Sequence, residues 1–121
     1  MDNKKTILLI DDDSDLLENT SFMIKSSGFD VLTGENGLDA VKKYKEFAPN
    51  LVIMDVKMPQ MDGFEAFFKI KQYDPNAKVV LITAYSIDEE KHNKAQSMGL
   101  IDTVSKPYSF DTIEDIVNRY A

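Results

Sequence analysis

Short runs of apolar residues alternate along the chain with longer stretches in which apolar residues recur at helical spacing. Three of these runs, at 7–10, 51–54 and 79–82, are apolar at every position, which is typical of strands buried on both faces of a sheet. A shorter run at 31–33 predicts another strand. Residues 102–105 predict a fifth strand, and their polarity suits an edge of the sheet.

The stretches between and after these strands predict five helices, four of which have a clear apolar face. Residues with capping side chains mark two helix starts: Asp13 or Ser14 for the first and Ser109 or Asp111 for the last. Asp62-Gly63 indicates a turn or the start of the third helix. The expected inner faces are Leu16, Leu17, Thr20, Met23 and Ile24; Ala40, Val41, Tyr44, Phe47 and Ala48; Phe64, Phe67, Phe68 and Ile70; and Ile113, Ile116, Val117 and Tyr120.

The fourth helix, from Asp88 to Met98, is so polar that we expect it to be the least well anchored of the five. Regular alternation of strands and helices implies an α/β fold with a parallel sheet, helices on both faces and right-handed crossovers. The length of 121 residues suits one domain spanning residues 1–121.

The composition excludes several classes of function. The net charge is −7 and cationic residues do not cluster, which argues against nucleic acid as a direct partner. There is no cysteine for thiol chemistry. The single histidine, His92, lies in a polar stretch, which argues against both a histidine metal site and a Ser/His/Asp triad. No apolar run could span a bilayer, and the N-terminus is too short for a signal peptide, so we expect a cytoplasmic protein.

Polar groups stand at the carboxyl ends of four predicted strands. Asp11 and Asp12 follow the first, Asp55 the third, and Thr83 ends the fourth, while Lys106 follows the fifth. Because the carboxyl ends of parallel strands meet at one edge, these side chains should lie together. Three carboxylates in one place repel one another unless a cation joins them, and an all-oxygen ligand set favours Mg²⁺.

A magnesium ion held by few carboxylates needs further oxygen ligands, and a phosphoryl group supplies them. Such a group also suits the ammonium of Lys106 and the hydroxyl of Thr83. The chemistry that this set can perform is phosphoryl transfer onto a carboxylate. Asp55 is the expected nucleophile, because its strand is central and lies between the acidic pair and Thr83.

With these residues laid out, the chain resembles a response-regulator receiver domain of two-component signalling. The resemblance runs from Ile7 to Tyr120. It rests on the apolar strand that leads into Asp11-Asp12, on Asp55-x-x-Met58-Pro59-x-Met61-Asp62-Gly63, on Thr83-Ala84, on Gly99 and on Lys106-Pro107. It implies a doubly wound, five-stranded parallel sheet of order 2-1-3-4-5, the flavodoxin-like arrangement known from this family.

The resemblance also implies roles for the strand-end residues. Asp55 would accept a phosphoryl group from a phosphohistidine on a sensor histidine kinase or a histidine phosphotransfer protein. Asp12, Asp55 and the backbone carbonyl of Lys57 would bind Mg²⁺, with Asp11 acting through water. Lys106 would pair with the phosphoryl charge.

In the same way, Thr83 would bond a phosphoryl oxygen. Phosphorylation would shift an equilibrium near the fourth helix and fifth strand, and so switch the binding of a downstream effector protein or pass the phosphate on. A monomeric signalling switch is expected, rather than a turnover enzyme.

Some positions depart from the usual pattern of the family or mark a subgroup of it. Many receivers carry Tyr or Phe three residues before the lysine, where this chain has Thr103, and Ala after the glycine, where it has Leu100. Lys57 and Tyr85 are similar to the corresponding positions of the stand-alone regulator type in sporulation phosphorelays. If these two long side chains flank the phosphoryl group, they should slow its hydrolysis.

Two other functions share part of this pattern. A phosphatase of the haloacid-dehalogenase class also uses a strand-end aspartate with Mg²⁺, and Asp11-x-Asp13 superficially fits its opening motif. That motif needs Thr or Val where Asp15 stands, and the chain has no late acidic pair at a strand end. The second alternative is an interaction module that works without phosphate, which the loss of Asp12, Asp55 or Lys106 would favour; all three are present.

Overall fold

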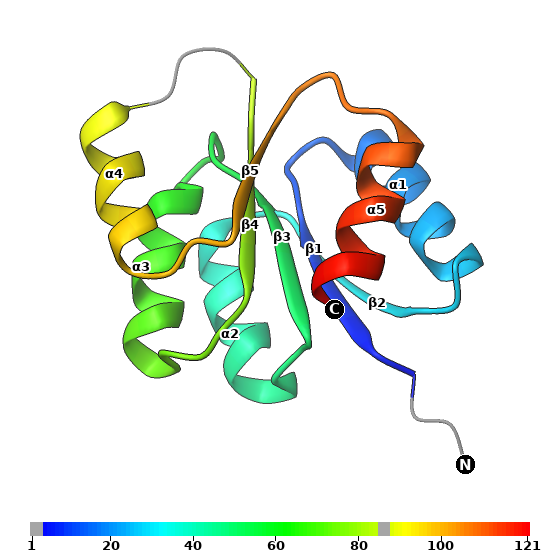
Figure 1. Cartoon of the computed structure of the whole chain (residues 1–121), viewed down its shortest axis with the longest axis horizontal. Coiled ribbons are helices and arrows are strands. Elements are labelled where there is room, and N and C mark those ends of the chain that lie inside the picture. The colour runs from blue at the N-terminus through cyan, green and yellow to red at the C-terminus, as the bar shows by residue number, and fades with distance from the viewer. Residues whose placement is uncertain (1–3, 85–87) are drawn as a thin grey trace.

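Five strands and five helices alternate along the chain in the computed structural model, which describes residues 4–84 and 88–121 (Figure 1). The expectation for Tyr85 lies outside these residues. In chain order the elements are β1 (Thr6–Ile10), α1 (Ser14–Ser26), β2 (Asp30–Gly34), α2 (Gly37–Phe47), β3 (Leu51–Asp55), α3 (Gly63–Tyr73), β4 (Val79–Thr83), α4 (Glu89–Ser97), β5 (Asp102–Ser105) and α5 (Phe110–Tyr120).

All strand pairs are parallel, and the sheet has the order β2-β1-β3-β4-β5. In Figure 1 the sheet stands nearly edge-on, with α1 and α5 covering one face and α2, α3 and α4 the other. This confirms the predicted α/β fold and its strand order. It also places β3 at the centre of the sheet and β2 and β5 at its two edges.

The three continuous apolar runs form strands that are buried on both faces, as predicted. Successive residues of β1 point to opposite sides, so Leu8 packs in the cluster beneath α2 and α3. Leu9 packs in the cluster beneath α1 and α5. Both are inaccessible or nearly so, and β3 and β4 alternate in the same way. The backbone at the carboxyl ends of these strands is therefore held from two sides.

The helix starts agree with the capping signals. The side chains of Asp13, Asp62 and Ser109 accept hydrogen bonds from backbone N–H groups in the first turns of α1, α3 and α5. Asn36 and Asp88 do the same for α2 and α4. Each cap satisfies N–H groups that have no partner within the helix.

The inner face of α2 ends earlier than its spacing predicted. Ala40 and Tyr44 are buried, but Phe47 is 50% exposed and Ala48 lies outside the helix in the left-handed conformation, at φ 46°. Pro49 explains the conformation of Ala48, because a residue before proline is disfavoured in the helical conformation. The apolar spacing continued beyond the point at which the backbone could remain helical.

α4 is held mainly by polar contacts, as its composition predicted. Among its described residues only Ala95 is buried. Lys94 Nζ lies 4.7 Å from the centre of the Phe68 ring, and Lys91 Nζ lies 3.8 Å from Asp62 Oδ2. His92 Nε2 is 3.0 Å from the hydroxyl of Thr103 on β5, a contact that the sequence did not indicate.

Because α4 buries so little apolar surface, we expect it to open locally without global unfolding. In native-state hydrogen exchange, amides in the second half of α4 should show protection at least about tenfold lower than those of α3, which buries Phe64, Phe67 and Ile70. Equal protection of the two helices would show that the polar contacts anchor α4 as firmly as a core helix.

Candidate functional site

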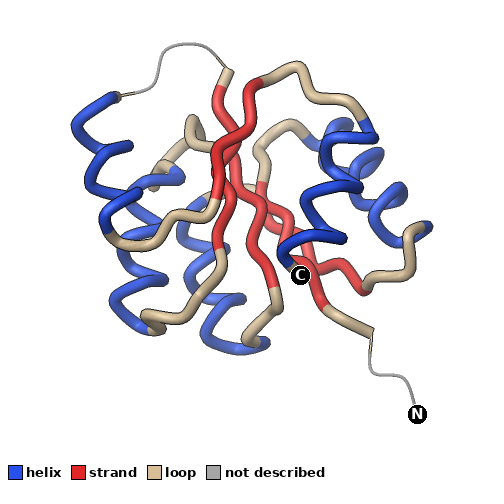
Figure 2. The backbone as a smooth tube through the Cα atoms, viewed as in Figure 1, coloured by secondary structure: helices blue, strands red, loops and turns tan. Residues whose placement is uncertain are grey.

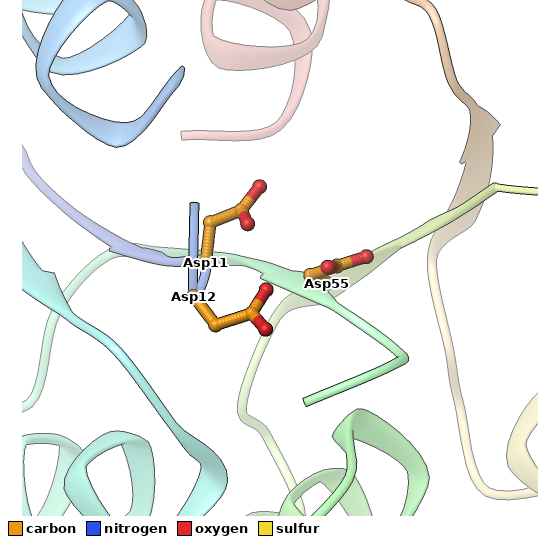
Figure 3. A group of neighbouring side chains, drawn as sticks. All are labelled: Asp11, Asp12 and Asp55. Atoms are coloured by element: carbon orange, nitrogen blue, oxygen red, sulfur yellow. The ribbon is translucent and has the colours of Figure 1, made fainter. Parts of the chain in front are cut away.

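Three carboxylates converge at the carboxyl ends of β1 and β3, as predicted. One oxygen each from Asp11, Asp12 and Asp55 lies within 4.8 Å of the others. Figure 3 shows the side chains of Asp11 and Asp12 on opposite sides of the end of β1, with Asp55 facing the space between them. Asp11 is 3% exposed and Asp55 5% exposed, whereas Asp12 is open to solvent.

Strand register explains why these carboxylates meet. Ile10 of β1 lies opposite Met54 of β3, so the next residues, Asp11 and Asp55, emerge side by side. The N–H of Asp11 donates to the carbonyl of Gly34 (3.1 Å), and its Oδ1 accepts from the N–H of Asp13 (2.9 Å). These bonds fix the first carboxylate before any ligand arrives.

Lys106 brings a positive charge into the cluster from the far edge of the sheet. Its Nζ lies 3.1 Å from Asp11 Oδ2 and 3.3 Å from Asp55 Oδ2. Its backbone N–H donates to the carbonyl of Thr83 (2.7 Å), which ties the loop after β5 to the end of β4. The ammonium therefore bridges two carboxylates that would otherwise repel each other.

The two remaining predicted site residues are Thr83 and Lys57. Thr83 is buried at the end of β4, beside β3, where Ile82 pairs with Asp55. Within the described residues its hydroxyl forms no hydrogen bond with the carboxylates. Lys57 is exposed in the loop after β3. In the same part of the chain, no donor bonds its carbonyl oxygen, which leaves that oxygen available as a ligand.

Gly63 lets α3 begin directly against the backbone of the site. Its N–H donates to the carbonyl of Val56 (2.7 Å). A Cβ at this position would lie 2.8 Å from the Cα of Val56 and would collide with the carbonyl of Asp55. Glycine is therefore required here by the closeness of the two backbones.

Burial and repulsion raise the pKa of Asp55 from 3.8 to about 6. Desolvation is the largest cause and the charge of Asp11 the second; the charge of Asp12 adds to both, and Lys106 acts in the opposite direction. Burial alone would lower the pKa of Lys106, but its hydrogen bond with Asp11 and the charges of Asp11 and Asp55 raise it above its ordinary value. At neutral pH the ammonium is therefore charged.

Tyr108 is a neighbour of the site that the sequence did not single out. Its hydroxyl lies 3.0 Å from that of Thr20 on α1, which joins the loop after β5 to α1. Burial raises the pKa of Tyr108, and the charges of Asp11, Lys106 and Asp55 also act on it. The only signal available beforehand was its position two residues after Lys106.

The donor set suits a small, hard divalent cation. All three clustered side chains offer oxygen, which is the ligand that Mg²⁺ prefers. With Lys106 counted, the ionised site carries two net negative charges, which one divalent cation would balance. The geometry can thus hold a cation next to the partly solvated carboxylate of Asp55.

Comparisons with known proteins point to one family. The model of the response regulator receiver domain matches residues 7–118. Chemotaxis protein CheY from Halobacterium salinarum is 36% identical over 115 residues, covering 94% of both chains. Sporulation initiation phosphotransferase F from Bacillus subtilis is 31% identical over 120 residues, covering 99% of this chain and 95% of that protein.

A solved structure shows the same fold. The response regulator protein TrrA from Thermotoga maritima, crystallised in complex with Mg²⁺-BeF, aligns with a TM-score of 0.84 at 29% identity. The alignment covers 97% of this chain and 99% of that one. In the described part of this chain, no helix is both long enough and apolar enough to cross a bilayer.

The raised pKa of Asp55 makes its ionisation costly to the folded state. Since the folded protein holds this proton more tightly than the unfolded chain, stability should fall as pH rises from about 4 to about 6. Replacing Asp55 with Asn should remove that cost. At pH 7.5 without divalent cations we expect the free energy of unfolding to rise by about 1 kcal/mol, after allowance for solvent screening, and Tm by about 3–5 °C.

This gain should become small near pH 3.5, where the carboxyl is protonated in the folded state and mostly protonated in the unfolded chain. Thermal unfolding of the wild type and of Asp55→Asn across pH 3.5–7.5 measures it. A gain that is independent of pH, or a loss at pH 7.5, would contradict the assigned burial and repulsion.

Proposed function

The chain belongs to the response regulator receiver domain family, and we propose that it acts through Asp55, which accepts a phosphoryl group. It is homologous to phosphoacceptor regulators of chemotaxis and sporulation. Its function is therefore that of a phosphoacceptor response regulator in a two-component or phosphorelay system. The observation that carries the assignment of Asp55 is its carboxylate, which ends the central strand within the three-carboxylate cluster.

In the proposed reaction, a carboxylate oxygen of Asp55 attacks the phosphorus of a phosphohistidine. The new O–P bond forms as the P–N bond breaks, and the histidine leaves as imidazole after taking up a proton. The donor is a sensor histidine kinase or a histidine phosphotransfer protein. A carboxylate that is held rigidly and only partly solvated is well placed for such an attack, because little reorganisation is needed.

We assign the magnesium ligands to Asp12, Asp55 and the carbonyl of Lys57, with Asp11 acting through water. Bound Mg²⁺ would balance the charge of the transferring phosphoryl oxygens. The clustered carboxylate oxygens support this assignment, as does the solved complex of TrrA with Mg²⁺-BeF. Exposed Asp12 is the most accessible carboxylate, whereas Asp11 is already engaged by Lys106.

Lys106 and Thr83 are proposed to hold the phosphoryl group after transfer. Lys106 already bridges Asp11 and Asp55, so exchanging one carboxylate contact for a phosphoryl oxygen needs only a small movement of Nζ. Thr83, at the neighbouring strand end, supplies a hydroxyl donor without a competing partner among the carboxylates. Both groups favour the more negative, phosphorylated state.

The signal would pass to a downstream effector protein, or the phosphate to a further carrier. Position 103 has no aromatic ring to rotate, and the hydroxyl of Thr103 contacts His92 of α4 instead. α4, held mainly by polar contacts, is the element that a change at Thr83 could shift at small cost. The protein is thus a switch in signalling rather than a turnover enzyme.

The geometry disfavours the hypothesis that the protein is a phosphatase. That hypothesis requires Asp11 and Asp13 to act together. Asp13 instead caps α1, where its side chain accepts hydrogen bonds from the N–H groups of Asp15 and Leu16. Asp12, and not Asp13, joins the cluster. A phosphate-independent module would not need all three carboxylates and the lysine to remain together.

Phosphorylation should depend on Asp55 alone. Incubating the protein with acetyl phosphate and Mg²⁺ should add one phosphoryl group that hydroxylamine removes, as expected for an acyl phosphate. Asp55→Asn should show at least about a hundredfold less adduct by intact mass spectrometry, because an amide is a poor nucleophile. Comparable labelling of the variant would place the acceptor elsewhere.

The affinity for Mg²⁺ should depend on Asp12 and much less on its neighbour Asp13. Asp12→Asn removes a proposed ligand and should weaken Mg²⁺ binding about tenfold or more, measured by calorimetric titration. Asp13→Asn makes the same charge change one residue away and keeps a capping side chain, so its affinity should stay within about threefold of the wild type. Equal losses in both variants would refute the ligand set and leave only a general charge effect.

A further inference from the structure

The outer strand β2 has an open edge. It pairs with β1 on one side and is the last strand of the sheet on the other (Figures 1 and 2). Two shallow hollows, of about 510 and 480 Å³, lie along it, and Val31 and Lys25 line both. None of the residues that line these hollows belongs to the carboxylate cluster, and the proposed phosphorylation does not use them.

The backbone of β2 directs hydrogen-bonding groups towards that edge. The N–H of Asp30 donates to Lys5 and the carbonyl of Gly34 accepts from Asp11, so these two residues face β1. Because residues alternate along a strand, Val31 and Thr33 turn their N–H and C=O groups outward. Lys43 confirms this direction, since its ammonium donates to the carbonyl of Thr33 from outside the sheet.

Apolar side chains flank the edge on both faces of the sheet. Phe22 of α1 is 73% exposed and borders one hollow; half-exposed Phe47 at the end of α2 borders the other. Val31 and Leu32 are only partly buried. Large apolar groups gathered along an unpaired strand mark a surface that gains by being covered.

Charges are ordered along the edge in a way that fits a second copy of the chain. Lys4 and Lys25 line the hollow at the beginning of β2, and Asp30 only partly offsets them. Glu18 and Glu35 line the hollow near its end, where they outnumber Lys25. A copy running in the opposite direction would place its acidic end against the basic end of the first, twice by symmetry.

We propose that two copies of this chain associate through β2, forming an antiparallel pair about a two-fold axis at Leu32. Val31 of each copy lies opposite Thr33 of the other, and their outward N–H and C=O groups bond. Leu32 meets Leu32 on the face that carries α2. Lys25 of each α1 approaches Glu18 of the other.

Lys43 limits this association. Its ammonium donates a hydrogen bond to the carbonyl of Thr33, so the second copy has to displace the lysine before the strands can pair. Lysines at sheet edges commonly hinder pairing in this way. The net charge of −7 on each copy adds repulsion. The dimer is therefore weak, and the monomer prevails in dilute solution.

Sedimentation velocity over a range of protein concentrations tests the proposal. Lys43→Met frees the carbonyl of Thr33 and should tighten dimerisation about tenfold relative to the wild type. Asp39→Asn is the matched control: it removes the ion pair between Asp39 and Lys43 (3.3 Å) but keeps the lysine. It should leave dimerisation within about threefold of the wild type. If Lys43→Met shows no more self-association than the wild type, the proposal is wrong.

Charge reversal tests the two-fold arrangement in the Lys43→Met background. Lys25→Glu or Glu18→Lys alone should weaken the dimer about three- to tenfold, and the two together should restore it, because each reversed charge then meets its complement. If the double variant dimerises more weakly than either single variant, the antiparallel pairing is wrong. Adding Asp55→Asn should leave association unchanged, so failure here is separate from failure of the phosphorylation site.

Discussion

Three carboxylates at one edge of the sheet repel one another, and the fold has to hold them together against that repulsion. It does so through strand register, which places Asp11 and Asp55 side by side because β1 and β3 are neighbours. Both strands are buried between two layers of helices, so neither end can move away without disturbing the core. Lys106 supplies one positive charge, and the remaining negative charge makes this edge suited to a divalent cation.

Rigidity at the site contrasts with the weak anchoring of α4 next to it. The strand ends are fixed by apolar packing, whereas α4 buries little and relies on contacts such as His92 with Thr103. Polar contacts of this kind can be exchanged at small cost, because water or another partner replaces them. A switch needs both properties: a fixed place for the chemistry and an adjoining element with more than one accessible position.

The two edge strands of the sheet, β5 and β2, differ in the side chains that contact them. On β5, side chains already engage the strand: Asp102 accepts from the N–H of Thr103, and His92 contacts the Thr103 hydroxyl. On β2, Lys43 covers the carbonyl of Thr33. Edge strands that are only partly covered keep some capacity to pair, and this difference directs the proposed self-association to β2.

The sequence by itself determined the elements, the sheet and the composition of the site. Continuous apolar runs can be satisfied only by burial on both faces, and a parallel sheet then forces the residues that follow them to one edge. Asp11, Asp55 and Lys106 could therefore be named as neighbours before any contact was known. The caps of α1 and α5 were each predicted as one of two neighbouring candidates, since capping is a local interaction between residues two or three positions apart.

Only the tertiary structure decided which groups touch. The pairing of Lys106 with Asp11, the contact of Tyr108 with Thr20, and that of His92 with Thr103 join residues from different elements. The exposure of Phe47 at the end of α2 was also missed, because apolar spacing does not show how far the surface that a helix packs against extends. Such contacts depend on distances between separately packed elements, which no periodicity along the chain encodes.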